Sequence, residues 1–255
     1  MKEQLRLIGR ISIFVWRVFE TLFYTRGNFR AIMEQTAFVS IRSLGTIMAA
    51  GGFVGAILVL QFNLMLTKYD AQSLLGGLNT SAIIREIGPL LISFLLAGKI
   101  GAYTAAELAT MRVTEQIEAI ECLGTDPLQF IVVPRFFAII FSSMIVLCIG
   151  LTVSVAGSMV LAQWMYGINF LSFASSIPRF TDPWTFFGGF FKSLVYSFIV
   201  AGVCCYQGYN ASGGAKGVGR AVTHAAIYTN FYIVIANFTS SHFVDILREF
   251  WESFS

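Results

Sequence analysis

Residues 43–67 form an unbroken stretch that contains no Asp, Glu, Lys or Arg. An α-helix rises about 1.5 Å per residue, so a helix of this length can cross the roughly 30 Å hydrocarbon core of a bilayer. Charged residues make up only 12% of the chain, whereas an ordinary soluble domain has about 25%. A soluble fold could not cover its surface with so few charges. We therefore predict an all-α membrane protein whose surface is largely solvated by lipid.

Four further stretches are apolar enough to be transmembrane helices, which gives five predicted spans in all. In chain order these are 43–67, about 83–110, 136–165, about 183–206 and about 221–244. Between the first two spans, Gly76, Gly77 and Asn79 suggest a loop over residues 68–82. The Gly-rich residues 208–220 suggest a tight cytoplasmic turn before the last span.

The N-terminal residues 3–23 are amphipathic. At 100° per residue their charged side chains fall within about 100° of arc, and the remaining face is mostly apolar. These charged residues are Glu3, Arg6, Arg10, Arg17 and Glu20. A narrow charged stripe on a broad apolar body is typical of a helix that lies in the membrane interface; a short first span is the alternative. Because Arg17 and Glu20 interrupt the apolar run, we expect no cleavable signal peptide.

We expect a single domain over residues 1–255. Residues 1–42 form its interfacial and cytoplasmic N-terminal region, residues 43–244 its five-span core, and residues 245–255 an amphipathic tail.

The Lys and Arg residues outside the spans are distributed unevenly between the two sides of the membrane. The side that holds the N-terminal region receives Lys2, Arg6, Arg10, Arg17, Arg26, Arg30, Arg42, Arg112, Arg135, Lys216 and Arg220. The opposite side receives only Lys68, Arg179 and Arg248, with Arg85 of the second span close to it. Cytoplasmic segments are enriched in Lys and Arg, so we expect a cytoplasmic N-terminus and, with five spans, a periplasmic C-terminus. No organellar transit composition is visible, which favours a bacterial inner-membrane protein.

Residues 112–123 are predicted to form a short amphipathic helix on the cytoplasmic side. Its apolar stripe consists of Val113, Ile117 and Ile120, and its acidic face of Glu115, Glu118 and Glu121. Arg112 and Gln116 belong to the same segment. Such a helix is suited to dock into a groove on a partner protein, as coupling helices do in ATP-driven transporters. The alternative is an ordinary interfacial loop helix.

Four ionisable residues fall within the second predicted span: Arg85, Glu86, Lys99 and Glu107. A charge inside the membrane costs about 2.5–3.5 kcal/mol on insertion scales, so each side chain should face protein or water. Arg85 and Glu86 lie near the periplasmic end, where they can reach the interface. Lys99 and Glu107 are predicted to be buried polar residues, which form either a structural ion pair or the lining of a lipid headgroup path.

The sequence offers no site for chemistry on this chain. It contains no Walker A motif, and the Gly-rich residues 208–220 follow a predicted span instead of a strand. The cysteines, Cys122, Cys148, Cys204 and Cys205, have no metal-ligand spacing, and His224 and His242 are isolated. We expect no metal, no cofactor and no catalytic residues here. ATP and Mg²⁺, if they drive this protein, should be bound by a separate ATPase.

Several ordered sequence motifs closely resemble the MlaE (YrbE) family of permeases. They are Arg85-Glu-Ile-Gly-Pro89, Ala97-Gly-Lys-Ile-Gly101, Ala105-Ala-Glu107, Met111-Arg-Val-Thr-Glu-Gln116, Gly124-Thr-Asp-Pro127, Val133-Pro-Arg135, Gly208-Tyr-Asn210 and Gly213-Gly-Ala-Lys-Gly-Val-Gly-Arg-Ala221. The resemblance extends from about residue 45 to residue 240. The order and spacing of these motifs make it specific.

This resemblance implies the transmembrane subunit of an ABC transporter that moves phospholipid or related lipid between the inner membrane and the periplasm. Two permease chains would form the membrane core, either as a homodimer or as a non-identical pair. Each would bind an ABC ATPase through the segment that matches residues 112–123. A hexameric MCE-domain protein would cover the periplasmic side, and a STAS-domain protein joins the ATPase in many such systems. No nucleic acid is implied.

By the same resemblance, the lipid would lie in an outward-open pocket at the dimer interface. Arg85 and Glu86 would lie near its mouth, and Leu60, Gln61 and Leu64 are the expected wall residues. The Gly213–Gly219 run also resembles permeases of other MCE systems, so fatty acids or sterols are alternative substrates. The competing hypotheses are a membrane-embedded lipid-modifying enzyme that uses Glu107 or His224, and a channel lined by Lys99 and Glu107.

Overall fold

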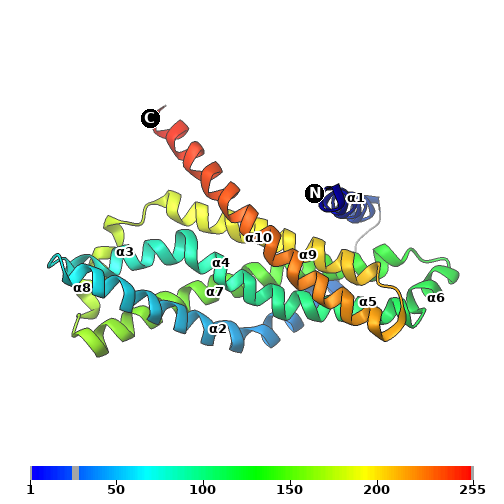
Figure 1. The fold of residues 1–255 in the computed structure, drawn as a ribbon, viewed down its shortest axis with the longest axis horizontal. Helices are drawn as coiled ribbons and strands as arrows, with labels where there is room; N and C mark the ends of the chain where they lie inside the picture. The colour runs from blue at the N-terminus through cyan, green and yellow to red at the C-terminus, as the bar shows by residue number, and fades with distance from the viewer. Residues whose placement is uncertain (1, 25–28, 254–255) are drawn as a thin grey trace. The chain divides into compact units, whose positions relative to one another are not determined.

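A computed structural model describes residues 2–24 and 29–253, and all its regular elements are helical. The α-helices are α1 (Lys2–Tyr24), α2 (Phe29–Thr67), α3 (Leu75–Ala82), α4 (Gly88–Leu96), α5 (Ala102–Val113), α6 (Gln116–Cys122), α7 (Val133–Tyr166), α8 (Phe170–Ser176), α9 (Pro183–Tyr209) and α10 (Gly214–Glu252) (Figure 1). Short 3₁₀ helices are η1 (Gln72–Leu74) and η5 (Ile177–Arg179). Three π-helical turns are η2 (Ile83–Ile87), η3 (Ala97–Gly101) and η4 (Leu128–Val132).

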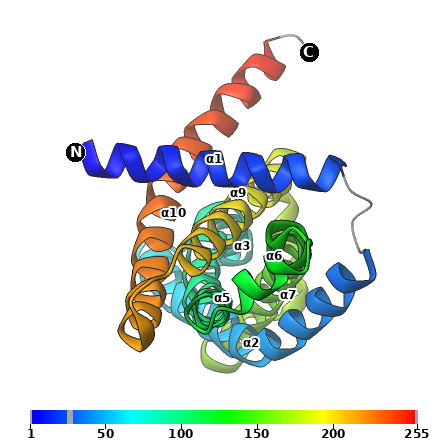
Figure 2. The same ribbon diagram turned by 90° about the vertical axis from the view of Figure 1, so that its right-hand side faces the viewer.

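The chain divides into two compact units, to which the long helices contribute different segments. The first unit contains residues 1–43, 94–143 and 196–233, and the second contains residues 44–93, 144–195 and 234–255. In the first unit α1 runs across α9 (Figure 2). There the ring of Phe14 packs edge-on against Tyr206, with 5.7 Å between the ring centroids.

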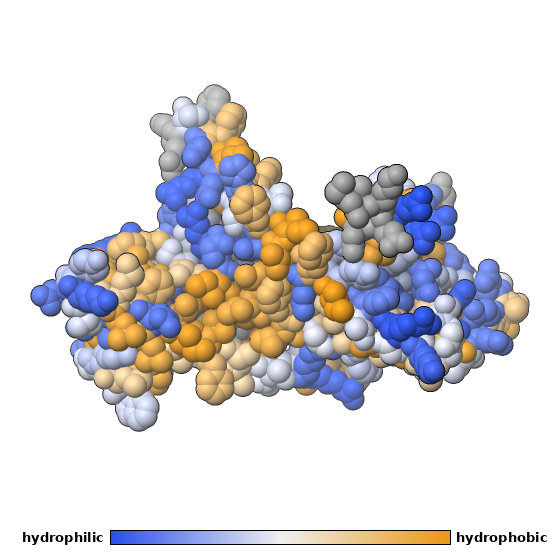
Figure 3. Space-filling view, in the orientation of Figure 1, coloured by the Kyte–Doolittle hydropathy of each residue, from blue (hydrophilic) through white to orange (hydrophobic). Residues whose placement is uncertain are grey.

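Within the described residues, four helical stretches are long and apolar enough to cross a membrane: 29–67, 72–113, 128–166 and 183–209. They confirm the apolar core of four predicted spans. The fifth predicted span lies inside α10, which is long enough but too polar to meet the same criterion, since it carries Thr, His, Asn and Ser side chains along its length. The five-span count therefore stays a prediction. Many large apolar side chains are exposed to the surroundings, as the orange atoms in Figure 3 show.

Small residues allow α2 and α7 to pack closely in the second unit. A Cβ atom on Gly51 would lie 2.6 Å from the carbonyl oxygen of Gly150, and one on Gly55 would overlap the carbonyl oxygen of Ser154. The hydroxyls of Ser154 and Ser158 donate to the carbonyls four residues earlier in α7, at 2.8 Å each. These bonds satisfy the hydroxyls inside their own helix, so the small side chains can line a tight contact between helices.

The loop predicted over residues 68–82 was wrong for most of its length, because α3 begins at Leu75. Gly76 and Gly77 are buried against α8, where a Cβ on Gly76 would overlap the carbonyl oxygen of Phe173. The backbone N–H of Gly77 donates to Ser176 Oγ at 2.9 Å. These glycines allow α3 and α8 to pack closely and do not mark a turn. Glycine is common both in turns and in close helix contacts, so a single sequence does not distinguish the two roles. The turn predicted over 208–220 is likewise shorter, since α10 begins at Gly214.

The α2–α7 contact predicts opposite effects for two glycine substitutions in α2. Gly55→Ala should force the helices apart and lower the thermal unfolding midpoint of the purified protein by several degrees, as overpacking costs about 1–3 kcal/mol. Gly45→Ala is the matched control, because a Cβ at Gly45 meets no described atom within 4 Å. It should be neutral or stabilising, since alanine is the better helix former. Equal midpoints for the two variants would contradict this packing.

Candidate functional site

The second unit contains a buried cation. Lys192 lies in the middle of α9, and only 1% of its side chain is exposed. Its Nζ lies 2.6 Å from Glu86 Oε1 and donates to the backbone carbonyl of Arg85 at 2.8 Å. Both acceptors belong to the π-helical turn η2. Because an ammonium removed from water needs such partners, Lys192 ties α9 to this turn.

The C-terminal part of α10 supplies the remaining partners of η2. Ser241 Oγ lies 3.1 and 3.2 Å from the two carboxylate oxygens of Glu86. Arg85 forms an ion pair with Asp245. Arg85, Glu86, Lys192, Ser241 and Asp245 are called the charge network below. Its side chains come from three separate helical segments, so it fixes their relative positions at this level.

A second ion pair lies where α9 begins. Asp182 precedes Pro183, and its Oδ1 accepts from the Thr185 N–H at 2.9 Å and from the Thr185 hydroxyl at 2.7 Å. Asp is a favoured N-cap residue and Pro is favoured at the first helical position, so the pair defines the helix start. Asp182 Oδ2 lies 3.0 Å from Arg248 Nη2 of α10. The Thr185 hydroxyl bond, helped by the Thr185 N–H and Arg248, lowers the pKa of Asp182 despite partial burial.

The charge network leaves almost no free volume. Arg85, Glu86 and Lys192 line a cavity of about 10 Å³, which is the volume that a single water requires. In this conformation the network is a closed cluster and has no space for a lipid headgroup. Leu60, Gln61 and Leu64, the other predicted pocket residues, do not line this cavity. Gln61 and Leu64 are exposed on α2 and Leu60 is partly buried. Their assignment to a lipid pocket stays a prediction.

The first unit has its own ion pair, between Glu107 of α5 and Arg135 of α7. Arg135 Nη2 lies 3.0 Å from Glu107 Oε1, and Arg135 Nε lies 3.3 Å from Oε2. The Arg135 side chain is only 14% exposed, and its Nη1 also donates to the carbonyl of Ile131 at 3.1 Å. Glu107, predicted to be a buried polar residue, is thus partly buried and paired with Arg135. Lys99 is partly buried in the π-helical turn η3.

A short helix is present where docking to a partner was predicted. It is α6, and it begins at Gln116, four residues later than expected, because Arg112 and Val113 still belong to α5. The break between the two helices falls at Thr114 and Glu115, and Glu115 takes a left-handed backbone conformation with φ of 59°. Such a conformation is costly for any residue other than glycine, so the break is a defined corner in the chain.

Side chains on either face hold α6 in place. Ile117 is 0% exposed and anchors the apolar side. Arg112 Nη1 lies 2.7 Å from Glu118 Oε1, so this pair spans the corner between α5 and α6. Glu115, Gln116 and Glu121 are exposed. The helix therefore presents a fixed acidic surface.

Sequence reasoning missed most of the partners in these clusters. Asp245 and Ser241 lie far along the chain from Arg85 and Glu86, and no local pattern links them. One signal could have been used more fully: Lys192 is the only charged residue between Pro183 and Tyr209. A lone charge in such an apolar run requires a buried acidic partner.

The charge network predicts unequal costs for removing its two central charges. Glu86→Gln removes the negative charge, so the Lys192 ammonium stays buried with uncharged acceptors only, which should cost about 3–5 kcal/mol of stability. Lys192→Met should cost less, because Glu86 is 37% exposed and keeps Ser241 as a donor. The double variant should be more stable than Glu86→Gln alone. The thermal unfolding midpoints of all the variants in detergent form a double-mutant cycle. If the losses of stability in the two single variants add up to the loss in the double variant, the pairing of Lys192 with Glu86 is ruled out.

The N-cap of α9 predicts a pH-dependent contribution to stability. The ionised Asp182 stabilises the folded state at pH values above its ordinary pKa of 3.8, and this contribution is lost as the pH falls through the lowered folded-state value. At neutral pH, Asp182→Ala should cost about 1 kcal/mol, whereas Asp182→Asn keeps a cap and should cost less. Unfolding midpoints measured above and below pH 3.8 should show the wild-type advantage over Asp182→Asn shrinking in acid. An advantage that grows in acid would contradict this assignment.

Comparison with known proteins shows which family this chain is similar to. The family model described as Permease MlaE matches residues 32–243. A protein of Synechocystis that carries the name Probable ABC transporter permease protein is 37% identical, over 87% of this chain and 84% of its own length. A protein of Rickettsia conorii with the same description is 32% identical, over 91% of this chain and 89% of its own length. The chloroplastic protein TRIGALACTOSYLDIACYLGLYCEROL 1 of Arabidopsis thaliana is 32% identical, over 85% of this chain and 62% of its own length. This chain therefore belongs to the MlaE family of ABC transporter permeases.

Proposed function

We propose that this permease moves phospholipid, or a related lipid, between the bilayer and an MCE-domain protein on the periplasmic side. ATP would be hydrolysed by a separate ABC ATPase on the cytoplasmic side, with a STAS-domain protein as a further partner of that ATPase. The observation that carries this proposal is the combination of apolar spanning helices with the braced acidic helix α6. An ABC transporter permease needs a rigid element that receives motion from its ATPase. The helix α6 suits this role, because Ile117 and the Arg112–Glu118 pair hold it in place.

The bracing of α6 explains how a force on it would reach the membrane helices. The buried Ile117 and the Arg112–Glu118 pair fix α6 to the end of α5. Further along α5, Glu107 is paired with Arg135 of α7. A displacement of α6 would therefore act on two long helices together, because ion pairs and packed side chains resist independent movement. The exposed Glu115 and Glu121 would contact basic residues of the ATPase.

A lipid substrate is favoured by the surface of α2. Phe53, Ile57 and Leu64 are 71%, 56% and 64% exposed. With Gln61 they form a series spaced by four, four and three residues, which places all four on one face of α2. An apolar face interrupted by one amide suits a contact with a second permease chain and with lipid tails. The Arabidopsis relative carries the name of a galactolipid, which also favours a lipid cargo. The proposed assembly is a dimer in the bacterial inner membrane, with the N-terminus cytoplasmic and the C-terminus periplasmic.

The proposal as a whole is tested by purifying the chain from its native membrane and identifying what remains bound. We expect mass spectrometry to find an ABC ATPase and an MCE-domain protein in the sample, together with phospholipid. Fatty acid or sterol in place of phospholipid would redirect the substrate assignment. If neither protein partner is found, the transport proposal fails.

Charge reversal on α6 tests the docking surface directly. Glu115→Lys and Glu121→Lys should each reduce the ATPase that co-purifies with the permease by about tenfold or more, because like charges would then face each other across the contact. Glu249→Lys, on the exposed surface of α10, is the matched control and should leave assembly unchanged. Membrane insertion should be normal in all the variants. Wild-type ATPase recovery in both α6 variants would mean that α6 is not the docking helix.

A further inference from the structure

An open basic hollow at the start of α10 is not used by the function proposed above. Its volume is about 610 Å³, and all its lining residues belong to the first unit. Three of them carry basic groups and the others are small: Lys216, Arg220, His224, Gly213, Gly219 and Thr223. A Cβ on Gly219 would meet no described atom within 4 Å, so a ligand can approach the hollow from outside.

No acidic side chain offsets the positive charge of this hollow. Residues 183–244 contain no Asp or Glu. Among the carboxylates that the structure describes, none forms an ion pair with Lys216 or Arg220. Arg220 Nη2 donates to the backbone carbonyl of Ser212 at 3.3 Å, which holds the guanidinium at the hollow without neutralising it. An anionic ligand would supply the missing negative charge.

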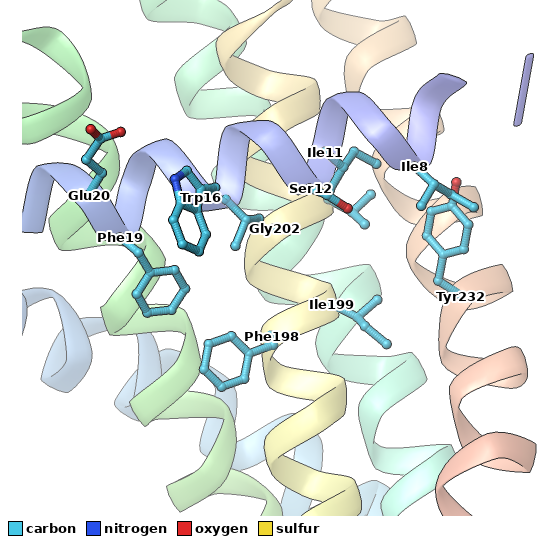
Figure 4. A pocket seen from close by; sticks show the side chains of 12 residues that line it. Ile8, Ile11, Ser12, Trp16, Phe19, Glu20, Phe198, Ile199, Gly202 and Tyr232 are labelled. Carbon is cyan, nitrogen blue, oxygen red and sulfur yellow. The ribbon is translucent and has the colours of Figure 1, made fainter. Parts of the chain in front are cut away.

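The larger groove beneath α1 has a different character (Figure 4). Its lining is apolar apart from Ser12, Tyr232 and the Glu20 carboxylate. The described residues that line it include no Lys, Arg or His. A carboxylate without a basic neighbour repels an anionic group. Of these two openings in the first unit, the hollow at α10 is therefore the one that fits an anion.

The exposed face of α10 changes from basic to apolar within a few turns. At 100° per residue, five exposed side chains of this segment fall within about 80° of arc. They are Lys216, Arg220, His224, Ile227 and Phe231. Ile227 and Phe231 are 57% and 52% exposed, whereas residues 217, 221, 225 and 229 are buried. A ligand that covers this face needs an anionic group at one end and an apolar body at the other.

The predicted fifth span places this change at the membrane surface. The span begins at about residue 221. At about 1.5 Å rise per residue, Arg220 and Lys216 lie about 2 and 8 Å outside it, and Ile227 lies about 9 Å inside it. The headgroup layer outside the hydrocarbon core is roughly 5–8 Å thick on each side. The two basic residues therefore fall at the depth of the headgroups, and Ile227 falls among the acyl chains.

We propose that this face of α10 binds an anionic phospholipid of the cytoplasmic leaflet. The phosphate group accepts hydrogen bonds from Lys216, Arg220 and His224 in the hollow, and the acyl chains lie along Ile227 and Phe231. The bound lipid neutralises the start of α10 and holds the helix at a fixed depth. The site is separate from the pocket expected at α2 and η2. It rests on the fifth predicted span and not on the transport proposal.

An acidic surface of a soluble partner protein is the competing occupant. Such a surface would neutralise Lys216 and Arg220, but it would not cover Ile227 and Phe231, which lie at the depth of the acyl chains. An anionic phospholipid covers both parts of the face with one molecule. It also accounts for their order along the helix, because its charged and apolar ends are arranged in the same direction.

Photocrosslinking from position 227 tests the site. Ile227 is replaced by the photoreactive p-benzoylphenylalanine, and the permease is purified with the proteins bound to it. The sample is placed in phosphatidylcholine nanodiscs that contain a small fraction of phosphatidylglycerol, and the crosslinked lipid is identified by mass spectrometry. We expect phosphatidylglycerol to exceed its share of the nanodisc lipid about fivefold or more, since each basic residue near an anionic lipid contributes a factor of about five.

The same probe in place of Phe141 is the matched control. Phe141 is 47% exposed on α7 and lies at a similar depth in the predicted span 136–165. It should report the composition of the bulk lipid, without enrichment of phosphatidylglycerol.

Charge variants make the result specific. Lys216→Gln combined with Arg220→Gln should reduce the enrichment at position 227 to the value at position 141. Lys216→Arg combined with Arg220→Lys keeps both charges and should retain it. Arg30→Gln removes an exposed charge on the same predicted side but outside the hollow, and should also retain it.

Three outcomes would overturn the site. They are equal lipid compositions at positions 227 and 141 in the wild-type background, enrichment that persists after both charges are removed, and crosslinks from position 227 to protein. The first outcome would favour the acidic surface of a partner as the occupant of the hollow. Neither ATP hydrolysis nor lipid transport enters the measurement, so its failure is distinct from a failure of the transport proposal.

Discussion

The burial of Lys192 constrains the rest of the second unit. An ammonium group without contact to water must be held by a carboxylate and by further acceptors. Glu86 supplies the carboxylate, and the π-helical turn η2 supplies a carbonyl at 2.8 Å. Ser241 and Arg85 connect this centre to α10. The glycine and serine contacts between α2 and α7 then set how closely the surrounding helices can approach.

The two units use ion pairs in different ways. In the second unit the charges form a closed network that excludes all but about one water molecule. In the first unit Glu107 and Arg135 join two long helices, and Arg112 and Glu118 hold a short surface helix in place. The closed network of the second unit suits a fixed structural role. The ion pairs of the first unit suit the transmission of movement. Both meet the requirement that charges near lipid be paired.

Much of the helical architecture can be predicted from the sequence, because it depends on local properties. The uncharged run 43–67 and the apolar character of residues 136–165 indicate membrane-length helices, and the structure contains them. The short helix α6 was recognisable from the spacing of Ile117 and Ile120. The α3–α8 contact was not, since Gly76 and Gly77 have the same sequence signature in a turn and in a helix contact. Pairings such as Arg85 with Asp245 join residues far apart in the chain, and local pattern does not encode them.

The π-helical turns have a further consequence for how this family can vary. Each widens the hydrogen-bonded ring from i→i+4 to i→i+5, so it accommodates one residue more than an α-helix would. An α-helical wheel takes no account of the wider turn, so on such a wheel the extra residue displaces all later side chains by about 100° from their true positions. Because η2 and η3 lie in the stretch 72–113, a single helical wheel drawn across either turn misassigns the faces of the residues that follow that turn. A relative that lacks one residue at Ile83–Ile87 or Ala97–Gly101 would close the π turn into an α-helix, and its later side chains would keep the same neighbours.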